Sequence, residues 1–278
     1  MTDTMSPGFQ VLAQIVRDQS GIVLTADKSY LVESRLRPVA RKHDFPSVEA
    51  LAESLRAWRD AIKINDVVDA MTTNESFFFR DNYPFHALRE RLLPRLAKAR
   101  AQTRRLRIWS AAASSGQEAY SIAMLLAEWR ASPPGCALDN WAIEILGTDI
   151  SREMVERARV GIYAQHEIER GLSAALREKY FTRAGDKWRI VEPLRRIVRF
   201  EQRNLLHDNG ALGVFDVVFC RNVLIYFDLP TKARVLAAIA RMMPDDGCLV
   251  LGGAETILGI SQAFQAAPGV AGVYAPVR

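Results

Sequence analysis

Hydrophobic and polar positions follow two different patterns along the chain, and the change falls near residue 100. Up to about residue 70 the apolar positions recur at helical spacing, with one stripe at 9–16 and another at 48–58, for which Ser47 is a candidate N-cap. Little strand character is present there. We therefore predict an N-terminal helical domain over residues 1–85 and a linking helix over 86–101.

From residue 102 onward, short apolar runs alternate with helical segments. Five runs have the length and composition of strands: LRIWSA, AIEILGTDI, IVRFEQ, FDVVFCRN and CLVLGGAE. Such alternation favours a parallel sheet covered by helices on both faces. We predict an α/β, Rossmann-like domain over residues 102–278.

One connection in this domain is longer than its neighbours. The chain between Asp149 and Asn204 has about twice the length that one helix and one strand need. Its surplus contains KYFTRAGDKWRIVEP, in which a turn signal at 184–186 separates two strand-like runs. We predict a small inserted antiparallel β-subdomain at about 178–196.

Composition narrows the class of protein. Hydrophobic residues make up 49% and charged residues 25% of the 278 positions, which is ordinary for a globular protein. No apolar run approaches the ~20 residues that cross a bilayer, and the N-terminus has no pattern of a signal peptide. Three widely spaced cysteines argue against a disulfide framework or zinc site and fit a reducing cytoplasm.

Charge points to an acidic partner without identifying it. The formal net charge is +5, and nucleic acid, a membrane surface and an acidic protein surface all remain open. Basic residues gather over 28–42, a segment in which Glu33 is the single acid. We expect one basic helix there, which Pro38 kinks or ends.

The first strand of the α/β domain leads into six small residues, 110–115, followed by Gly116 and Glu118. Small residues let the backbone approach a ligand, and glycine permits an unusual backbone angle before the next helix. The G-x-G-x-x-G pattern of a dinucleotide site is missing, and the Glu118 carboxylate would repel phosphate but suit a cation or amine. The alternative is that these residues only pack a helix against a strand.

Asp149 ends the second strand, where an acid usually binds a ribose diol. It could instead cap the following helix. Together with Glu118, it suggests a nucleoside without a phosphate tail, and S-adenosylmethionine fits, with Glu118 beside its ammonium group. Asn204 and Leu205 after the third strand suit an adenine edge and face, and the fourth strand leads into Arg221, Asn222 and Tyr226 at the mouth.

Five segments together resemble the chemotaxis receptor methyltransferase family, CheR: MTTNESFFFRD, WSAAASSGQEAYSIAM, GTDIS, RNLL and FCRNVLIYFD. The resemblance runs from about residue 9 to 260. It implies an all-helical domain, a class I S-adenosylmethionine-dependent methyltransferase domain, and methyl transfer to glutamate side chains on the cytoplasmic helices of chemoreceptors. It also implies that the β-subdomain docks on the receptor, in some members through a C-terminal receptor peptide, and that the basic helix faces the acidic methylation region.

The resemblance assigns cofactor contacts to positions in all five segments: Asn74, Ser76, Arg80, Glu118, Asp149, Asn204, Leu205, Arg221 and Asn222. Ser76 stands where many members have threonine. A larger departure is the GGAE sequence at 252–255, where many members read G-H-S-E; Glu255 is retained.

The chemistry of the expected substrate explains why the sequence shows no convincing general base. A glutamate carboxylate is ionised at neutral pH, so it needs no general base to attack a methyl carbon. We expect Arg80 or Tyr226 to orient this carboxylate, and catalysis to come from alignment of its oxygen with the methyl carbon and the sulfur. We expect no metal. We also expect the protein to be a cytoplasmic monomer that acts on receptors. Two alternatives stay open: a nucleic-acid methyltransferase, which the basic charge permits although no RNA-binding module is visible, and a non-catalytic module that senses the cofactor.

Overall fold

The computed structural model describes residues 6–131, 133 and 138–277. They form two compact units. The first consists of the chain up to Thr73 together with Tyr226–Thr231, and the second of Asn74–Ile225 and the chain from Lys232 onward.

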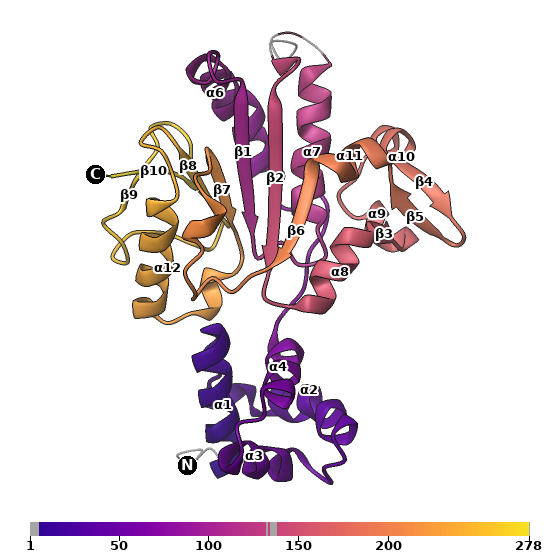
Figure 1. Ribbon diagram of the computed structural model, residues 1–278, viewed down its shortest axis with the longest axis vertical. Coiled ribbons are helices and arrows are strands. Elements are labelled where there is room, and N and C mark those ends of the chain that lie inside the picture. The colour runs from indigo at the N-terminus through magenta and orange to yellow at the C-terminus, as the bar shows by residue number, and fades with distance from the viewer. Residues whose placement is uncertain (1–5, 132, 134–137, 278) are drawn as a thin grey trace. The chain divides into compact units, whose positions relative to one another are not determined.

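The first unit is helical, as predicted (Figure 1). It contains α1 (Pro7–Ser20), a short 3-10 turn η1 (Ala26–Lys28), α2 (Ser29–Lys42), α3 (Val48–Ala57) and α4 (Ala61–Met71). Ser47 accepts a hydrogen bond from the Ala50 N–H, which confirms it as the N-cap of α3. The apolar stripes meet in a core whose most buried members are Leu12, Val16, Leu36, Leu51, Ala52, Leu55 and Val67.

Pro38 does not end the basic helix. Helix α2 continues through it to Lys42, so of the two outcomes expected for Pro38, a kink or an end, the end is wrong. Val39 and Ala40 follow the proline and are buried together with Leu36. Packing of this apolar face offsets the missing backbone donor, because tertiary contacts supply most of a helix's stability in a folded protein.

The second unit is built on a seven-stranded sheet in the order β6-β2-β1-β7-β8-β10-β9. All five predicted strands are present and pair in parallel: β1 (Arg105–Ala111), β2 (Ala142–Asp149), β6 (Val198–Gln202), β7 (Val217–Cys220) and β8 (Cys248–Leu251). Two further strands, β9 (Phe264–Ala266) and β10 (Val273–Pro276), add an antiparallel edge that the sequence pattern did not predict. The strand order reverses between β1 and β7, which is where such sheets bind ligands.

Helices precede and connect these strands. The predicted linking helix begins at Tyr83 but has three parts, α5 (Tyr83–Ala87), a π-helical turn η2 (Leu88–Leu92) and α6 (Leu93–Ala99). Helices α7 (Gln117–Arg130) and α8 (Arg152–Val160) follow β1 and β2, α11 (Glu192–Ile197) precedes β6, and α12 (Leu229–Arg241) lies between β7 and β8. Short 3-10 turns occur at η4 (Gly210–Leu212) and η5 (Leu224–Tyr226).

The inserted β-subdomain is also present. Strands β4 (Phe181–Ala184) and β5 (Lys187–Ile190) form an antiparallel hairpin around Gly185, whose φ is 67°. The predicted turn signal therefore lies at the turn. A third strand, β3 (Ile162–Tyr163), pairs with β5, and α9 (Gln165–Glu169) and α10 (Ala174–Tyr180) accompany the small sheet (Figure 1).

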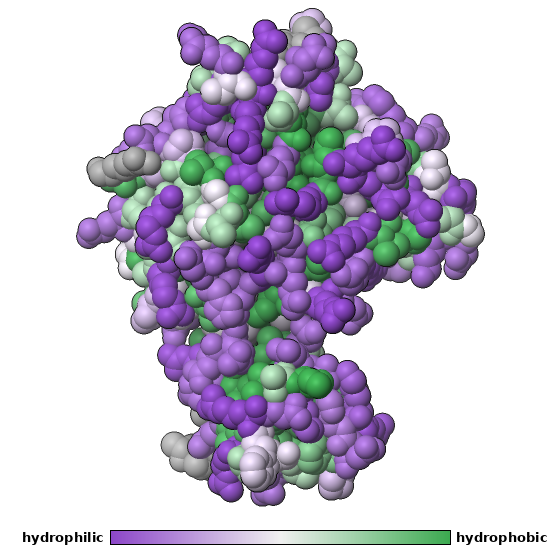
Figure 2. Space-filling view, viewed as in Figure 1, coloured by the Kyte–Doolittle hydropathy of each residue, from purple (hydrophilic) through white to green (hydrophobic). Residues whose placement is uncertain are grey.

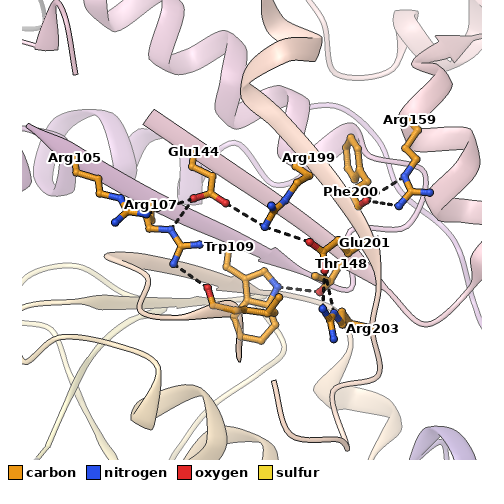
Figure 3. A network of polar contacts seen from close by, with 11 residues as sticks. Arg105, Arg107, Trp109, Glu144, Thr148, Arg159, Arg199, Phe200, Glu201 and Arg203 are labelled. Atoms are coloured by element: carbon orange, nitrogen blue, oxygen red, sulfur yellow. Dashed lines mark hydrogen bonds and ion pairs between the residues drawn. The ribbon is translucent and has the colours of Figure 1, made fainter. Parts of the chain in front are cut away.

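The two faces of the large sheet differ. One face carries Ile108, Ile145 and Phe200 in the same core as α7 and α8. On the other, charged side chains form a row across β1, β2 and β6 (Figure 3). Glu144 accepts from Arg107 at 2.7 Å and pairs with Arg199 at 3.3 Å, and the row continues through Glu201 to Arg203. Hydrophilic side chains likewise cover most of the visible surface of this unit (Figure 2).

Candidate functional site

The turn between β1 and α7 brings bare backbone to the carboxyl end of the sheet. Ala112, Ser114 and Gly116 all have left-handed backbone angles, with φ of 58°, 49° and 94°. This irregular path is closed by a hydrogen bond from the Gly116 N–H to the Ala113 carbonyl at 2.9 Å. The unusual backbone angle predicted for Gly116 is confirmed.

Gly116 also has a packing role. A Cβ there would lie 2.9 Å from the Ala158 Cβ and 3.0 Å from the Phe200 ring, so no side chain fits. The alternative interpretation, that small residues pack the helix against the sheet, thus accounts for part of this turn. It does not account for the carboxylates around it.

Asp149 stands at the end of β2 and binds the first turn. Its Oδ2 accepts from the Ser114 N–H at 2.7 Å and its Oδ1 from the Ser151 N–H at 2.9 Å. Burial raises the pKa of this carboxyl, and the backbone donors oppose that shift. Ser151, whose hydroxyl accepts from the Met154 N–H, is the N-cap of α8, so the capping alternative for Asp149 is not needed. The buried carboxylate therefore joins the exits of β1 and β2.

Glu118 is paired with Arg221 across the switch point. Its Oε2 accepts from the Arg221 guanidinium at 2.8 Å and its Oε1 from the Ser110 hydroxyl at 2.7 Å. The same guanidinium donates to the Asp81 carboxylate at 2.7 Å and to the Arg80 carbonyl at 3.0 Å. Two carboxylates and one guanidinium leave one net negative charge, which still suits a cation.

Arg221 is the most buried of the three ion-paired residues, since 1% of its side chain is exposed, against 13% for Glu118 and 46% for Asp81. Its Nε is buried and has no hydrogen-bond partner within the described part of the chain. Neither the ion pair with Glu118 nor the contribution of Asp81 was predicted from the sequence. Glu118 and Arg221 lie far apart along the chain, and the pairing of β1 with β7 brings them together.

The segment before α5 carries three of the predicted contacts. The Asn74 carbonyl accepts from the Ser114 hydroxyl at 3.0 Å, which joins this segment to the first turn. Ser76 is half-buried in the same segment. Arg80 donates to the Glu75 carbonyl at 2.9 Å and lies 5.4 Å from the centre of the Phe77 ring.

Backbone strain is concentrated in the same segment. Phe79, Asp81 and Asn82 have φ of 50°, 67° and 47°. The Phe79 N–H donates to the Ser121 hydroxyl of α7 at 2.9 Å, which holds the segment over the first turn. Non-glycine residues with left-handed backbone angles are energetically unfavourable, and they often mark ligand sites.

Asn204 and Leu205 follow β6 in a tight loop. The Arg203 N–H donates to the Asp149 carbonyl at 2.8 Å, so this loop starts beside the acid. The Asn204 side chain accepts from the Leu206 N–H at 2.9 Å, and its carbonyl accepts from Asn209. The side chain therefore shapes its own turn.

Asn222 follows Arg221 with a left-handed backbone, φ 58°. Its N–H donates to the carboxylate of Glu255, 2.8 Å away, which belongs to the GGAE segment after β8. Sequence reasoning noted Glu255 but assigned it no role. Tyr226 belongs to the first compact unit, where its carbonyl accepts from the Val23 N–H at 2.9 Å.

Other chemistry has little support in the described residues. They contain no group of three or more His, Cys, Asp or Glu side chains arranged to hold a metal ion, and no helix long and apolar enough to cross a membrane. Cys220 and Cys248 are buried free thiols; Cys136 lies outside the described residues. The carboxylates fit a cationic nucleoside, because Glu118 follows β1 at the turn where a phosphate-binding site relies on backbone donors.

The sheet order and these acids define a nucleoside-binding α/β domain of the methyltransferase type. Comparison with known families agrees with that class. The model for the CheR methyltransferase SAM-binding domain matches residues 74–273, and the model for the CheR methyltransferase all-alpha domain matches residues 7–72. The chain belongs to the CheR methyltransferase family and is an S-adenosylmethionine-dependent methyltransferase.

Relatives cover nearly the whole chain. It is 40% identical to a chemotaxis protein methyltransferase of Vibrio parahaemolyticus over 92% of both chains. It is 39% identical to chemotaxis protein methyltransferase 1 of Pseudomonas aeruginosa, over 94% of this chain and 96% of that one. Among solved structures, PKMT2 of Rickettsia typhi in complex with AdoHcy is 14% identical with a TM-score of 0.38, over 64% of this chain and 26% of that one.

Proposed function

We propose that the protein transfers a methyl group from S-adenosylmethionine to glutamate side chains of chemoreceptors, giving glutamate methyl esters and S-adenosylhomocysteine. The family match over both units carries this conclusion. The acids around the first turn support it independently, because they disfavour a phosphate-bearing cofactor.

The cofactor residues divide by chemistry. Asp149 would bind the ribose diol, and Asn204 with Leu205 the adenine. Glu118 would bind the ammonium, and Arg221 balances part of its charge. The remaining contacts would come from Asn74, Ser76, Arg80 and Asn222. When bound, the cofactor supplies a sulfonium methyl group, which passes to a carboxylate oxygen as the carbon–sulfur bond breaks.

The chain's own residues then have to align the two reactants. The receptor carboxylate is already ionised near pH 7, so no proton has to be removed. Arg80 and Tyr226 are the proposed orienting groups. A strong ion pair with the incoming carboxylate would weaken it as a nucleophile, so their role is positioning by hydrogen bonds.

Receptor recognition is proposed to involve the basic helix and the β-subdomain. Part of the charge of α2 is used inside the first unit: Arg35 donates to the Met71 and Thr72 carbonyls, and Lys42 pairs with Asp66. Lys28 and Arg41 form no ion pair among the described residues and remain for an acidic surface. We also propose a monomer, and the cytoplasm as its compartment, where the two buried free thiols stay reduced.

Transfer of radiolabelled methyl groups from S-adenosylmethionine tests this function. Receptor fragments should acquire label that alkali releases as methanol, because methyl esters hydrolyse in base. DNA and RNA should acquire none, which separates this function from a nucleic-acid methyltransferase. Cofactor binding without label on receptor fragments would favour the non-catalytic module instead.

A further inference from the structure

The Glu255 carboxylate binds the backbone of two strand exits. Its Oε2 accepts from the Asn222 and Gly252 N–H groups, both at 2.8 Å. Its Oε1 accepts from the Val223 N–H at 3.0 Å and the Leu224 N–H at 2.8 Å. An ionised carboxylate offers about four acceptor sites, so these four donors use its capacity.

Three of the donors are consecutive and converge on one anion. They follow β7, and the first of them belongs to Asn222, which has the left-handed backbone. Successive N–H groups around such a residue form an anion-binding concavity, or nest. Asparagine tolerates that conformation better than most residues, but three aligned donors need an acceptor. Glu255 fills the nest.

Space around the carboxylate explains one glycine of the GGAE segment. A Cβ on Gly252 would lie 2.8 Å from the Glu255 Oε2 and 3.0 Å from the Asn222 Nδ2, so a side chain would displace the carboxylate. A Cβ on Gly253 would meet nothing within 4 Å. Gly253 and Ala254 are exposed, so this chain's departure from G-H-S-E falls outside the contacts that Glu255 makes.

The nest adjoins the residues of the cofactor site. Arg221 immediately precedes it and reaches Glu118 from there. Cys220 is one residue earlier; burial raises the pKa of its thiol, and the charges of Glu255 and Glu118 raise it further. A change in the path of the loop would therefore move the Arg221 guanidinium and the Asn222 amide together.

We propose that Glu255 is a positioning residue for methyl transfer. It acts through the backbone of 222–224 to hold Arg221 and Asn222 in place for the cofactor. The inference rests on the proposed function in one respect, the assignment of these two residues to the cofactor site. It assigns the GGAE segment a role that does not depend on contact with substrate.

Glu255→Ala in the full-length protein tests the proposal. Calorimetry should show S-adenosylhomocysteine binding weakened about ten- to a hundred-fold, because binding must then order a nest that lacks its anion. The KM for receptor fragments should not change. Acetate at about 0.1 M should restore part of the affinity by entering the empty nest, whereas NaCl of the same ionic strength should not.

Control variants separate positioning from general destabilisation. Gly253→Ala should bind like wild type, and Gly252→Ala should weaken binding in the same direction as Glu255→Ala. Leu96→Ala removes a buried side chain of α6 away from the nest and should lower stability without changing the affinity of the folded protein. If Glu255→Ala does not fold, Glu255→Gln keeps the volume but brings an amide donor against backbone donors, and it should bind as weakly.

Two results would overturn the proposal. One is wild-type affinity in folded Glu255→Ala or Glu255→Gln. The other is a loss of affinity that Leu96→Ala reproduces at matched stability and that acetate does not relieve. Failure of the proposed function looks different, since wild type would then bind S-adenosylhomocysteine but leave receptor fragments unmethylated.

Discussion

Replacing Arg221 by methionine should destabilise the α/β unit through the charges it leaves behind. The Arg221 side chain is 1% exposed and the Glu118 side chain 13%, so Glu118 would keep only its bond from the Ser110 hydroxyl in a largely dry site. Asp81, 46% exposed, can be solvated and should add little. Removing one partner of a buried pair costs about 3–5 kcal/mol, and the partial exposure of Glu118 places the expected loss near the lower end.

A double-mutant cycle measures whether the two residues act as a pair. Glu118→Gln removes the unpaired charge, so Arg221→Met with Glu118→Gln should be less destabilised than the sum of the single variants by about 1.5–3 kcal/mol. Urea unfolding followed by tryptophan fluorescence gives these free energies, with the transition of the α/β unit analysed separately.

An exposed pair in the same unit is the matched control. Arg89 and Glu90 lie 3.3 Å apart with both side chains more than half exposed, and their coupling should stay below about 0.5 kcal/mol. A loss below about 1 kcal/mol for Arg221→Met, or additive effects at 221 and 118, would refute a buried ion pair as the basis of this site.

Three further predictions concern glycine, charge and backbone conformation. Gly116→Ala should lower the free energy of unfolding in urea by about 2–3 kcal/mol, because the strain of a positive φ and the overlap of the new Cβ with its neighbours add. Gly185→Ala has the same kind of backbone strain but its Cβ meets open space, so it should lower that free energy by about 1 kcal/mol. The hydrogen bond from Arg107 lowers the pKa of Glu144, so its ionised form stabilises the fold above pH ~4.3 and this stabilisation is lost on acidification. Glu144→Gln should thus be about 1 kcal/mol less stable than wild type at pH 7, with a difference that shrinks as the pH falls below ~4.3; a difference that does not shrink on acidification would contradict that origin. Asn222→Gly keeps the left-handed backbone, so it should fold normally but bind S-adenosylhomocysteine about tenfold more weakly; wild-type affinity would assign the amide a conformational role alone.

Sequence patterns were sufficient for elements with strong periodicity. The parallel strands β1, β2 and β7 are largely apolar runs with helices between them, and their bounds agree closely with the structure. Strands β9 and β10 were missed because they are short and lack alternation. The π-helical turn η2 within the linking helix likewise has no periodic signature.

Candidate residues were found where a local motif carries the chemistry, and their partners were missed where only the fold joins them. Asp149 and Glu118 follow strands, so position along the chain was enough to propose them. Arg221 was proposed as a cofactor contact, but its pairing with Glu118 depends on β1 lying beside β7. The role of Glu255 depends in the same way on neighbouring strand exits, because three of its four donors come from residues about 30 positions upstream.

Binding of S-adenosylhomocysteine to wild type and to Asp149→Ala tests the central claim most directly. Calorimetry should show micromolar binding by wild type, equivalent to about −8 kcal/mol, and little or none by Asp149→Ala at equal folded fraction. Asp186→Ala, which removes an exposed carboxylate at the hairpin turn, should bind like wild type. Absence of binding by wild type would contradict the cofactor assignment, and unchanged binding by Asp149→Ala would contradict the proposed pocket.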